Sequence, residues 1–146
     1  MAIPVIGKVV LDTNVFIDYL RTGDRADWVL GTHGQMIRFL SAVVLMELRI
    51  GADTTKRKRS IDRIQAAFPP DRLLAPTPQL FNRAGELFRR LYKGGTGVSD
   101  RLAPINDLLI ALTAWHIGGA VVTGNLFEFR RIAAHLPGLS VVPSDW

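Results

Sequence analysis

Short apolar runs alternate with longer amphipathic stretches along most of the chain. Runs rich in β-branched residues are typical of buried strands, and apolar residues three or four positions apart are typical of helices. Strands are therefore expected near residues 8–12, 36–40, 72–75, 120–123 and 139–142. Helices are expected near residues 14–21, 25–33, 41–51, 54–68, 79–92, 104–117 and 126–136. This alternation predicts an α/β fold in which a mostly parallel sheet is flanked by helices.

Composition sets limits on size and on metal chemistry. The 146 residues, 48% of them hydrophobic, suit a single domain spanning 1–146 with a real core. Cysteine is absent, which excludes disulfides and thiolate zinc sites. The three histidines are not spaced as metal ligands, and one of them, His116, is expected to be a core residue. Any metal would be held mainly by oxygen, which favours Mg²⁺ or Mn²⁺.

The chain is basic, with a formal net charge of +5 and a pI of about 10.2. A basic surface suits a polyanion such as RNA or DNA, although many basic proteins bind neither. One face of the helix expected at 54–68 carries Lys56, Arg59 and Arg63, which either follow a phosphate backbone or form an ordinary solvated surface. No signal-peptide pattern or membrane-length apolar run is present, so we expect a soluble, cytoplasmic protein.

Three acidic residues stand apart from the other acids, which fall in turns or on polar helix faces. Asp12 ends the first expected strand, and in open parallel sheets ligands bind just beyond the carboxyl ends of strands. Glu47 and Asp107 lie within nearly apolar segments. A carboxylate in a buried segment is costly unless it is paired or bound to a metal. From the order of the elements, all three acids are expected near the same edge of the sheet.

Carboxylates gathered at one edge repel one another, and a hard divalent cation relieves that repulsion. Such a cation lowers the pKa of a bound water and stabilises charge on a phosphoryl oxygen, which suits hydrolysis of a phosphodiester. For one acid alone, a helix cap or a buried ion pair would be the better interpretation. For Asp12, Glu47 and Asp107 together, the arrangement favours a metal site.

Four stretches of the chain also resemble a known family. They cover residues 10–15, 44–51, 105–111 and 122–129, and together they run through nearly the whole chain. Each is a weak motif alone, but all four in order resemble the PIN-domain ribonucleases, in particular the toxins of VapBC toxin–antitoxin pairs. The resemblance implies a three-layer α/β/α sandwich and a Mg²⁺- or Mn²⁺-dependent endoribonuclease. It also implies RNA as substrate, an antitoxin protein as partner, and a homodimer.

The resemblance assigns roles to particular side chains. Asp12 and Asp107 would bind the metal, Glu47 would complete the acidic cluster, and Thr123 would contribute a hydroxyl. The fourth acidic position of the family pattern falls on Asn125, whose amide supplies a neutral oxygen but no charge.

This departure affects the number of ions that the site is expected to hold. Glu128, three residues after Asn125, would compensate for the missing charge. One firmly held ion is expected rather than two.

Other residues near these motifs have two interpretations. Asn14 either caps the first helix, which is slightly favoured, or orients the acidic cluster. Arg49 and Arg101 are candidates for contacting RNA. The glycine-rich stretch 94–97 is expected to border the site. The apolar face of helix 79–92 is expected to be mostly core, and the resemblance suggests that any exposed part contacts an antitoxin or a second copy.

Two other classes of protein also place an acid after a first strand. Phosphohydrolases of the haloacid-dehalogenase type require a second aspartate two residues later, where this chain has Asn14. A non-catalytic binding module of the receiver type requires an acid pair and a lysine at the end of a late strand. The late strands here are expected to end in Thr123 and Val142. Both alternatives therefore lack a residue that they need.

Overall fold

The computed structural model describes residues 7–32, 35–92 and 101–146. Five strands and seven α-helices alternate along the described chain, with one short 3-10 helix, η1. In chain order they are β1 (Gly7–Leu11), α1 (Thr13–Thr22), α2 (Ala26–Leu30), β2 (Met36–Ser41), α3 (Ala42–Ile50), α4 (Thr55–Ala66), η1 (Pro70–Arg72), β3 (Leu73–Leu74), α5 (Pro78–Tyr92), α6 (Leu102–His116), β4 (Ala120–Thr123), α7 (Leu126–Ala133) and β5 (Ser140–Pro143). Every element expected from the sequence is present.

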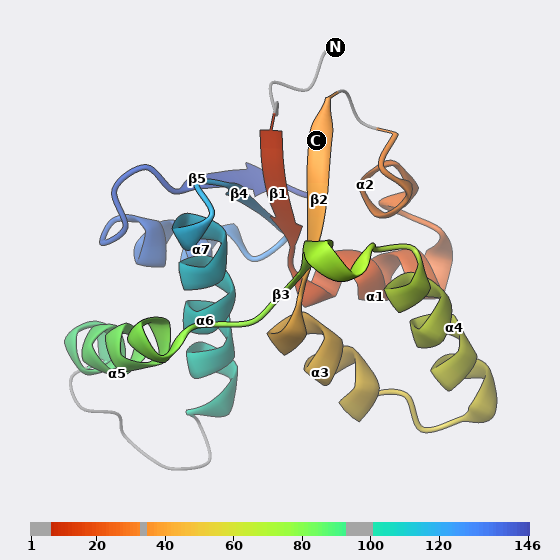
Figure 1. The fold of residues 1–146 in the computed structure, drawn as a ribbon, viewed down its shortest axis with the longest axis horizontal. Helices are drawn as coiled ribbons and strands as arrows, with labels where there is room; N and C mark the ends of the chain where they lie inside the picture. The colour runs from red at the N-terminus through yellow and green to blue at the C-terminus, as the bar shows by residue number, and fades with distance from the viewer. Residues whose placement is uncertain (1–6, 33–34, 93–100) are drawn as a thin grey trace.

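All five strands lie parallel in one sheet, in the order β3-β2-β1-β4-β5. β1 is central, and its Val10 lies beside Phe39 of β2 and Val121 of β4. Helices α5, α6 and α7 gather on one side of the sheet, while α1, α2 and α4 lie on the other (Figure 1). The three-layer α/β/α architecture with a parallel central sheet is therefore confirmed.

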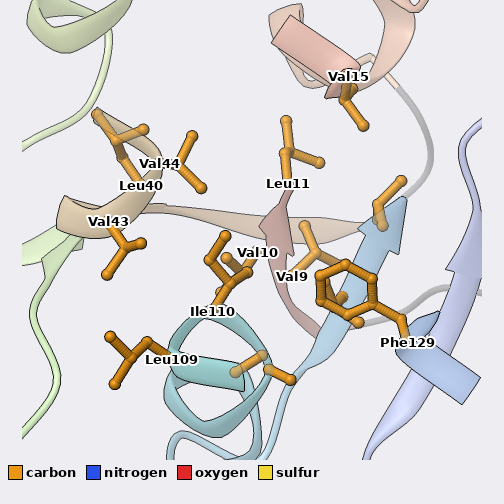
Figure 2. Close-up of a cluster of buried hydrophobic side chains, with 14 of the residues drawn as sticks. Val9, Val10, Leu11, Val15, Leu40, Val43, Val44, Leu109, Ile110 and Phe129 are labelled. Atoms are coloured by element: carbon orange, nitrogen blue, oxygen red, sulfur yellow. The ribbon is translucent and has the colours of Figure 1, made fainter. Parts of the chain in front are cut away.

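The core forms on both faces of β1 because its run of apolar residues can be covered from two sides. Val9, Val10 and Leu11 have no exposed surface. Figure 2 shows Leu11 on the side of Val15 of α1, and Val10 on the side of Ile110 of α6. Val15 and Ile110 are also fully buried. The sheet is thereby fixed between the two helices that flank the candidate site.

Local signals explain most of the boundaries. Ser41 ends β2 and caps α3, because its hydroxyl oxygen accepts hydrogen bonds from the backbone of Val43 (3.1 Å) and Val44 (3.5 Å). Gly23 follows α1 in the left-handed conformation (φ 80°), which costs glycine little. The helix expected around 25–33, with an end near Gly31 or Gly34, ends at Leu30, directly before Gly31 in the same left-handed conformation (φ 76°).

Of two sequence expectations outside the site, one is wrong and the other falls on residues that the structure does not describe. His116 is exposed at the end of α6, so the prediction of a buried core histidine is wrong. The last turn of α6 leaves the core there, which an apolar pattern read in sequence order does not reveal. The glycine-rich stretch 94–97 lies outside the described residues. Within the described residues, every helix is too short or too polar to cross a lipid bilayer.

Candidate functional site

The candidate site lies where the chain reverses its direction of winding across the sheet. From β1 the chain passes to β2 on one side, while β4 pairs with the other side of β1. In parallel sheets this switch point leaves a crevice beyond the carboxyl ends of the two strands. Asp12 directly follows β1, and Thr123 is the last residue of β4. Asp12 and Thr123 therefore both lie at this switch point, where a direct hydrogen bond joins them.

Asp12 is buried, with only 4% of its surface exposed, and its carboxylate is held by three donors. Oδ1 accepts a hydrogen bond from the backbone N–H of Thr13 (2.8 Å). Oδ2 accepts hydrogen bonds from the amide of Asn14 (3.1 Å) and from the hydroxyl of Thr123 (2.8 Å). Burial raises the pKa of Asp12, the three hydrogen bonds lower it, and the negative charge of Glu47 raises it further, with a net upward shift.

The role of Asn14 differs from the favoured expectation. Asp12 itself is the cap of α1, and Asn14 lies inside the first turn of that helix. The Asn14 amide donates to Asp12, while its oxygen accepts a hydrogen bond from the backbone N–H of Gly124 (3.2 Å). The capping prediction is therefore wrong, and the alternative, that Asn14 orients the acidic cluster, is confirmed. Asn14 also joins the end of β1 to the residue that follows β4.

Thr123 links Asp12 to the segment that contains Asn125. The Thr123 hydroxyl donates to Asp12 and accepts a hydrogen bond from the backbone N–H of Asn125 (2.9 Å). Thr123 is fully buried, so its hydroxyl needs both partners. Asn125 is exposed and its side chain does not cap α7. The amide at the expected fourth acidic position is thus open to solvent, next to the hydroxyl that holds Asp12.

Glu47 reaches the site from α3 and is held by two residues that the sequence analysis did not single out for it. The hydroxyl of Thr13 donates to its Oε1 at 2.5 Å, and the amide of Asn106 donates to its Oε2 at 3.4 Å. Asn106 is itself only 5% exposed. A buried amide inside the apolar helix α6 needs a hydrogen-bond partner. The polar residue Asn106 within that apolar segment is the sequence signal that could have identified it. Glu47 thereby ties α1, α3 and α6 together at the crevice.

Asp107 differs from the other two acids because no described residue pairs with it. Among the residues described, no hydrogen-bond donor or basic side chain pairs with its half-buried carboxylate. Burial raises the pKa of Asp107 to about 7, helped by the negative charges of Asp12, Glu47 and Glu128. All three predicted acids therefore lie close enough to influence one another electrostatically.

The three carboxylates are neighbours, but they do not form a ready-made set of ligands. Within the described parts of the chain, no three acidic or histidine side chains are placed to hold one metal ion together. Glu47 already accepts two hydrogen bonds, which direct it toward Thr13 and Asn106. The oxygen atoms available there as metal ligands belong to carboxylate, hydroxyl and amide groups. No basic side chain among the described residues neutralises the charge of Asp107. Such a donor set fits a hard cation such as Mg²⁺ or Mn²⁺ bound through few protein ligands and several waters.

The two arginines expected to contact RNA occupy different surroundings. The guanidinium of Arg49 lies 2.7 Å from Asp62 and also donates to Gln65 (3.2 Å), so it joins α3 to α4. Arg101 is exposed immediately before α6, the helix that carries Asp107. An RNA contact stays a prediction for both, and for Arg49 it would compete with the existing ion pair.

A groove of about 600 Å³ extends from Glu47 between α1, α3 and α4. Ile17, Leu48 and Ile61 contribute apolar walls, while Arg21 and Lys56 contribute positive charge. The exposed basic face of α4, with Lys56 at the groove, is consistent with either interpretation given to it from the sequence. Of the three acids, Glu47 lines this groove.

Comparison with known proteins identifies the family. The PIN domain model matches residues 9–135, and no curated protein sequence matches the chain. Among solved structures, the fold is similar to that of VapBC-1 from nontypeable Haemophilus influenzae, at 25% identity and a TM-score of 0.67, covering 95% of this chain and 99% of the other.

Two further solved structures are similar over nearly their whole length. DNA-bound VapBC from Salmonella typhimurium is 26% identical, with a TM-score of 0.64 and coverage of 95% of this chain and 99% of the other. VapBC2 from Rickettsia felis, bound to a DNA fragment from its promoter, is 21% identical, with a TM-score of 0.67 and coverage of 93% and 98%. With its central sheet, its acidic crevice and a family match over most of its length, this chain belongs to the PIN-domain family and shares its fold with chains of VapBC complexes.

Proposed function

We propose that this chain is a divalent-metal-dependent endoribonuclease and the toxin of a type II toxin–antitoxin pair. Membership of the PIN-domain family and the similarity to VapBC complexes support this proposal. The observation that carries it is the crevice itself, where three donors hold Asp12 and no residue in the described part of the chain pairs with Asp107. An unpaired, partly buried acid beside two others is unfavourable unless a cation binds there.

Asp12 and Asp107 are the proposed protein ligands of one Mg²⁺ or Mn²⁺ ion. When bound, such an ion supplies positive charge that stabilises a phosphoryl oxygen and favours deprotonation of water. The three hydrogen bonds to Asp12 fix its carboxylate before any ligand arrives, so little order has to be gained on binding.

Glu47 has a different proposed role from the two direct ligands. Its carboxylate is fixed by Thr13 and Asn106 and adds negative charge to the crevice. We assign it to orienting water or the ion at the edge of the crevice, with no direct bond to the ion required. Thr123 keeps Asp12 in place through its hydroxyl, and the exposed amide of Asn125 offers a neutral oxygen beside it.

RNA is the proposed substrate, and the groove between α1, α3 and α4 is its proposed approach to the acids. Arg21 and Lys56 along this groove would contact phosphates without reading sequence. Arg101, before α6, would contact the strand on the Asp107 side. The net charge of +5 supports a polyanionic substrate but does not distinguish RNA from DNA.

An antitoxin protein and a second copy of the chain are the proposed partners. The similar solved structures are VapBC complexes, which supports an antitoxin partner. On α5, Phe81 is 54% exposed although Leu80, Ala84 and Leu87 of the same helix are buried in the core. An exposed aromatic side chain on this helix supports a further protein contact there.

The test is cleavage of total RNA by the purified protein with about 5 mM Mn²⁺, a cation that oxygen ligands can hold. The Asp12→Asn variant should lose at least about 100-fold in rate, because removal of an outer partner alone typically costs 10–100-fold. Asp71→Asn, an exposed acid in η1, is the matched control and should cleave normally. Undiminished cleavage by Asp12→Asn, or by the wild-type protein in excess EDTA, would exclude the mechanism.

The two alternative classes gain nothing from the structure. Asn14 cannot serve as the acid of a haloacid dehalogenase, because its amide is committed to Asp12 and Gly124. The late strands end at Thr123 and Pro143, so neither presents the lysine that a receiver module requires.

A further inference from the structure

Three side chains on α5 and α7 form a cluster next to the crevice. The hydroxyl of Tyr92, the last residue of α5, donates to Oε2 of Glu128 on α7 at 2.8 Å. The guanidinium of Arg131, one turn further along α7, lies 3.7 Å from Oε1 of the same carboxylate. Both oxygens of Glu128 therefore have a partner, one from each side. We call Tyr92, Glu128 and Arg131 the α5–α7 clamp.

The ring of Tyr92 is fixed from two directions. It packs against Phe88, with ring centroids 5.0 Å apart, and the guanidinium of Arg131 lies 4.7 Å above its centroid. Arg131 also donates to the backbone carbonyl of Leu91. A cation over an aromatic face and a hydrogen bond to the backbone restrict the arginine as well. The clamp therefore holds Glu128 in one orientation, more firmly than an isolated surface ion pair would.

The clamp places Glu128 on the Asp107 side of the crevice. The charge of Glu128 acts on Asp107, and the charge of Asp107 in turn acts on Tyr92, so these groups lie near one another. Helices α5, α6 and α7, which carry these residues, pack together on the same side of the sheet (Figure 1).

We propose that Tyr92 and Arg131 are positioning residues that hold the Glu128 carboxylate beside Asp107, where it gives the crevice the fourth negative charge that Asn125 does not supply. This inference rests on the function proposed above. Because Oε2 accepts from Tyr92 and Oε1 faces Arg131 at 3.7 Å, we assign Glu128 to act through its charge or through water. A second ion would need a further direct ligand, so the clamp is consistent with a single ion.

The test is calorimetric titration of the wild-type protein with Mn²⁺ alone, compared with four variants. Glu128→Gln should weaken Mn²⁺ binding about ten-fold, as expected for an outer partner of a metal ligand. Tyr92→Phe removes only the hydroxyl, keeps the ring under Arg131, and should weaken binding by a smaller factor of about three. Arg131→Lys keeps the charge and should retain binding better than Arg131→Gln.

Two matched controls separate positioning from general damage. Tyr19→Phe removes the hydroxyl of the chain's other tyrosine, in α1, and Glu86→Gln removes an exposed acid of α5 that accepts from Asn82. Both controls should bind Mn²⁺ as the wild type does. In RNA cleavage, Tyr92→Phe should lower kcat while leaving KM unchanged, because the clamp does not touch the groove.

The outcomes distinguish this inference from the proposed function. If Asp12→Asn is inactive but Glu128→Gln and Tyr92→Phe bind Mn²⁺ with wild-type affinity, the clamp is only structural and this inference is overturned alone. A lower melting temperature in EDTA with unchanged Mn²⁺ affinity leads to the same conclusion. If the wild-type protein binds no Mn²⁺, both proposals are overturned.

Discussion

Replacing Asp107 with asparagine should stabilise the metal-free protein at neutral and alkaline pH. The pKa of Asp107 is raised from 3.8 to about 7 because the carboxyl is partly buried and faces other negative charges. A folded-state pKa above the unfolded value means that the folded protein holds this proton more tightly. Stability is therefore lost as pH rises from about 4 to about 7, and the loss is complete above pH 7.

The magnitude follows from the shift, discounted for exposure. A shift of roughly 3 units corresponds to about 4 kcal/mol at about 1.4 kcal/mol per unit. Asp107 retains some contact with solvent, and screening reduces such a value, so we expect a gain of about 2 kcal/mol for Asp107→Asn at pH 8. For a domain of this size the gain corresponds to a rise of about 6 °C in Tm.

The assay is thermal unfolding followed by circular dichroism in EDTA, from pH 4.5 to 8.5. The difference between Asp107→Asn and the wild type should be largest above pH 7 and should shrink toward pH 4. Asp71→Asn is the control and should show no such pH-dependent gain. Added Mn²⁺ should reverse the order, since an ion at about 100 times its Kd stabilises the protein that binds it by about 2.7 kcal/mol. Equal stability of the two proteins at pH 8 in EDTA would refute the electrostatic account of Asp107.

Three further changes test other contacts. The Mn²⁺ affinity of the wild type should fall up to about ten-fold per pH unit below pH 7, because the proton on Asp107 must leave before the ion binds. Calorimetry in two buffers of different ionisation enthalpy measures the released proton. Thr13→Val removes the hydroxyl that donates to Glu47 and should slow RNA cleavage about ten-fold, measured as kcat under saturating RNA. Gly119→Ala should destabilise the fold by about 2 kcal/mol in urea unfolding, because the new Cβ would lie 2.8 Å from the Lys8 carbonyl oxygen.

Each of these has a result that contradicts it. Affinity for Mn²⁺ that is independent of pH would show that no proton competes with the ion. Normal cleavage by Thr13→Val would show that Glu47 does not depend on that hydroxyl. The control for Gly119→Ala is Gly85→Ala in α5, where a Cβ meets nothing within 4 Å and helix propensity should give a gain of up to about 1 kcal/mol. Equal effects of the two alanines would contradict the steric argument.

The fold was predictable because the sequence carries its signals locally. The β-branched run that ends at Asp12 and the apolar spacing of α5 and α6 define strand and helix without reference to the rest of the chain. The sequence left two glycines as possible ends of α2, and the left-handed conformation of Gly31 places the end of the helix there. The exposure of His116 depends on how α6 leaves the core, which is set by packing between elements.

The three acids of the candidate site could be picked out from the sequence, but the contacts that hold them could not. Asp12, Glu47 and Asp107 stood out because charge in apolar segments is costly. The partners that hold them could not be read from the sequence, because Thr13 and Asn106 meet Glu47 only after α1, α3 and α6 pack together. The clamp was hidden for the same reason, since Tyr92 and Glu128 lie 36 positions apart.

The strand order divides the crevice between two halves of the chain. Asp12 and Glu47 come from the segment that builds β1, β2 and α3, whereas Asp107 and Thr123 arrive only with α6 and β4. A nascent chain that has not yet emerged beyond α5 therefore carries two of these three acids and lacks the hydroxyl that holds Asp12. Two separately expressed fragments, divided between α5 and α6, should each be inert and should reconstitute the crevice only by associating along the seam between β1 and β4.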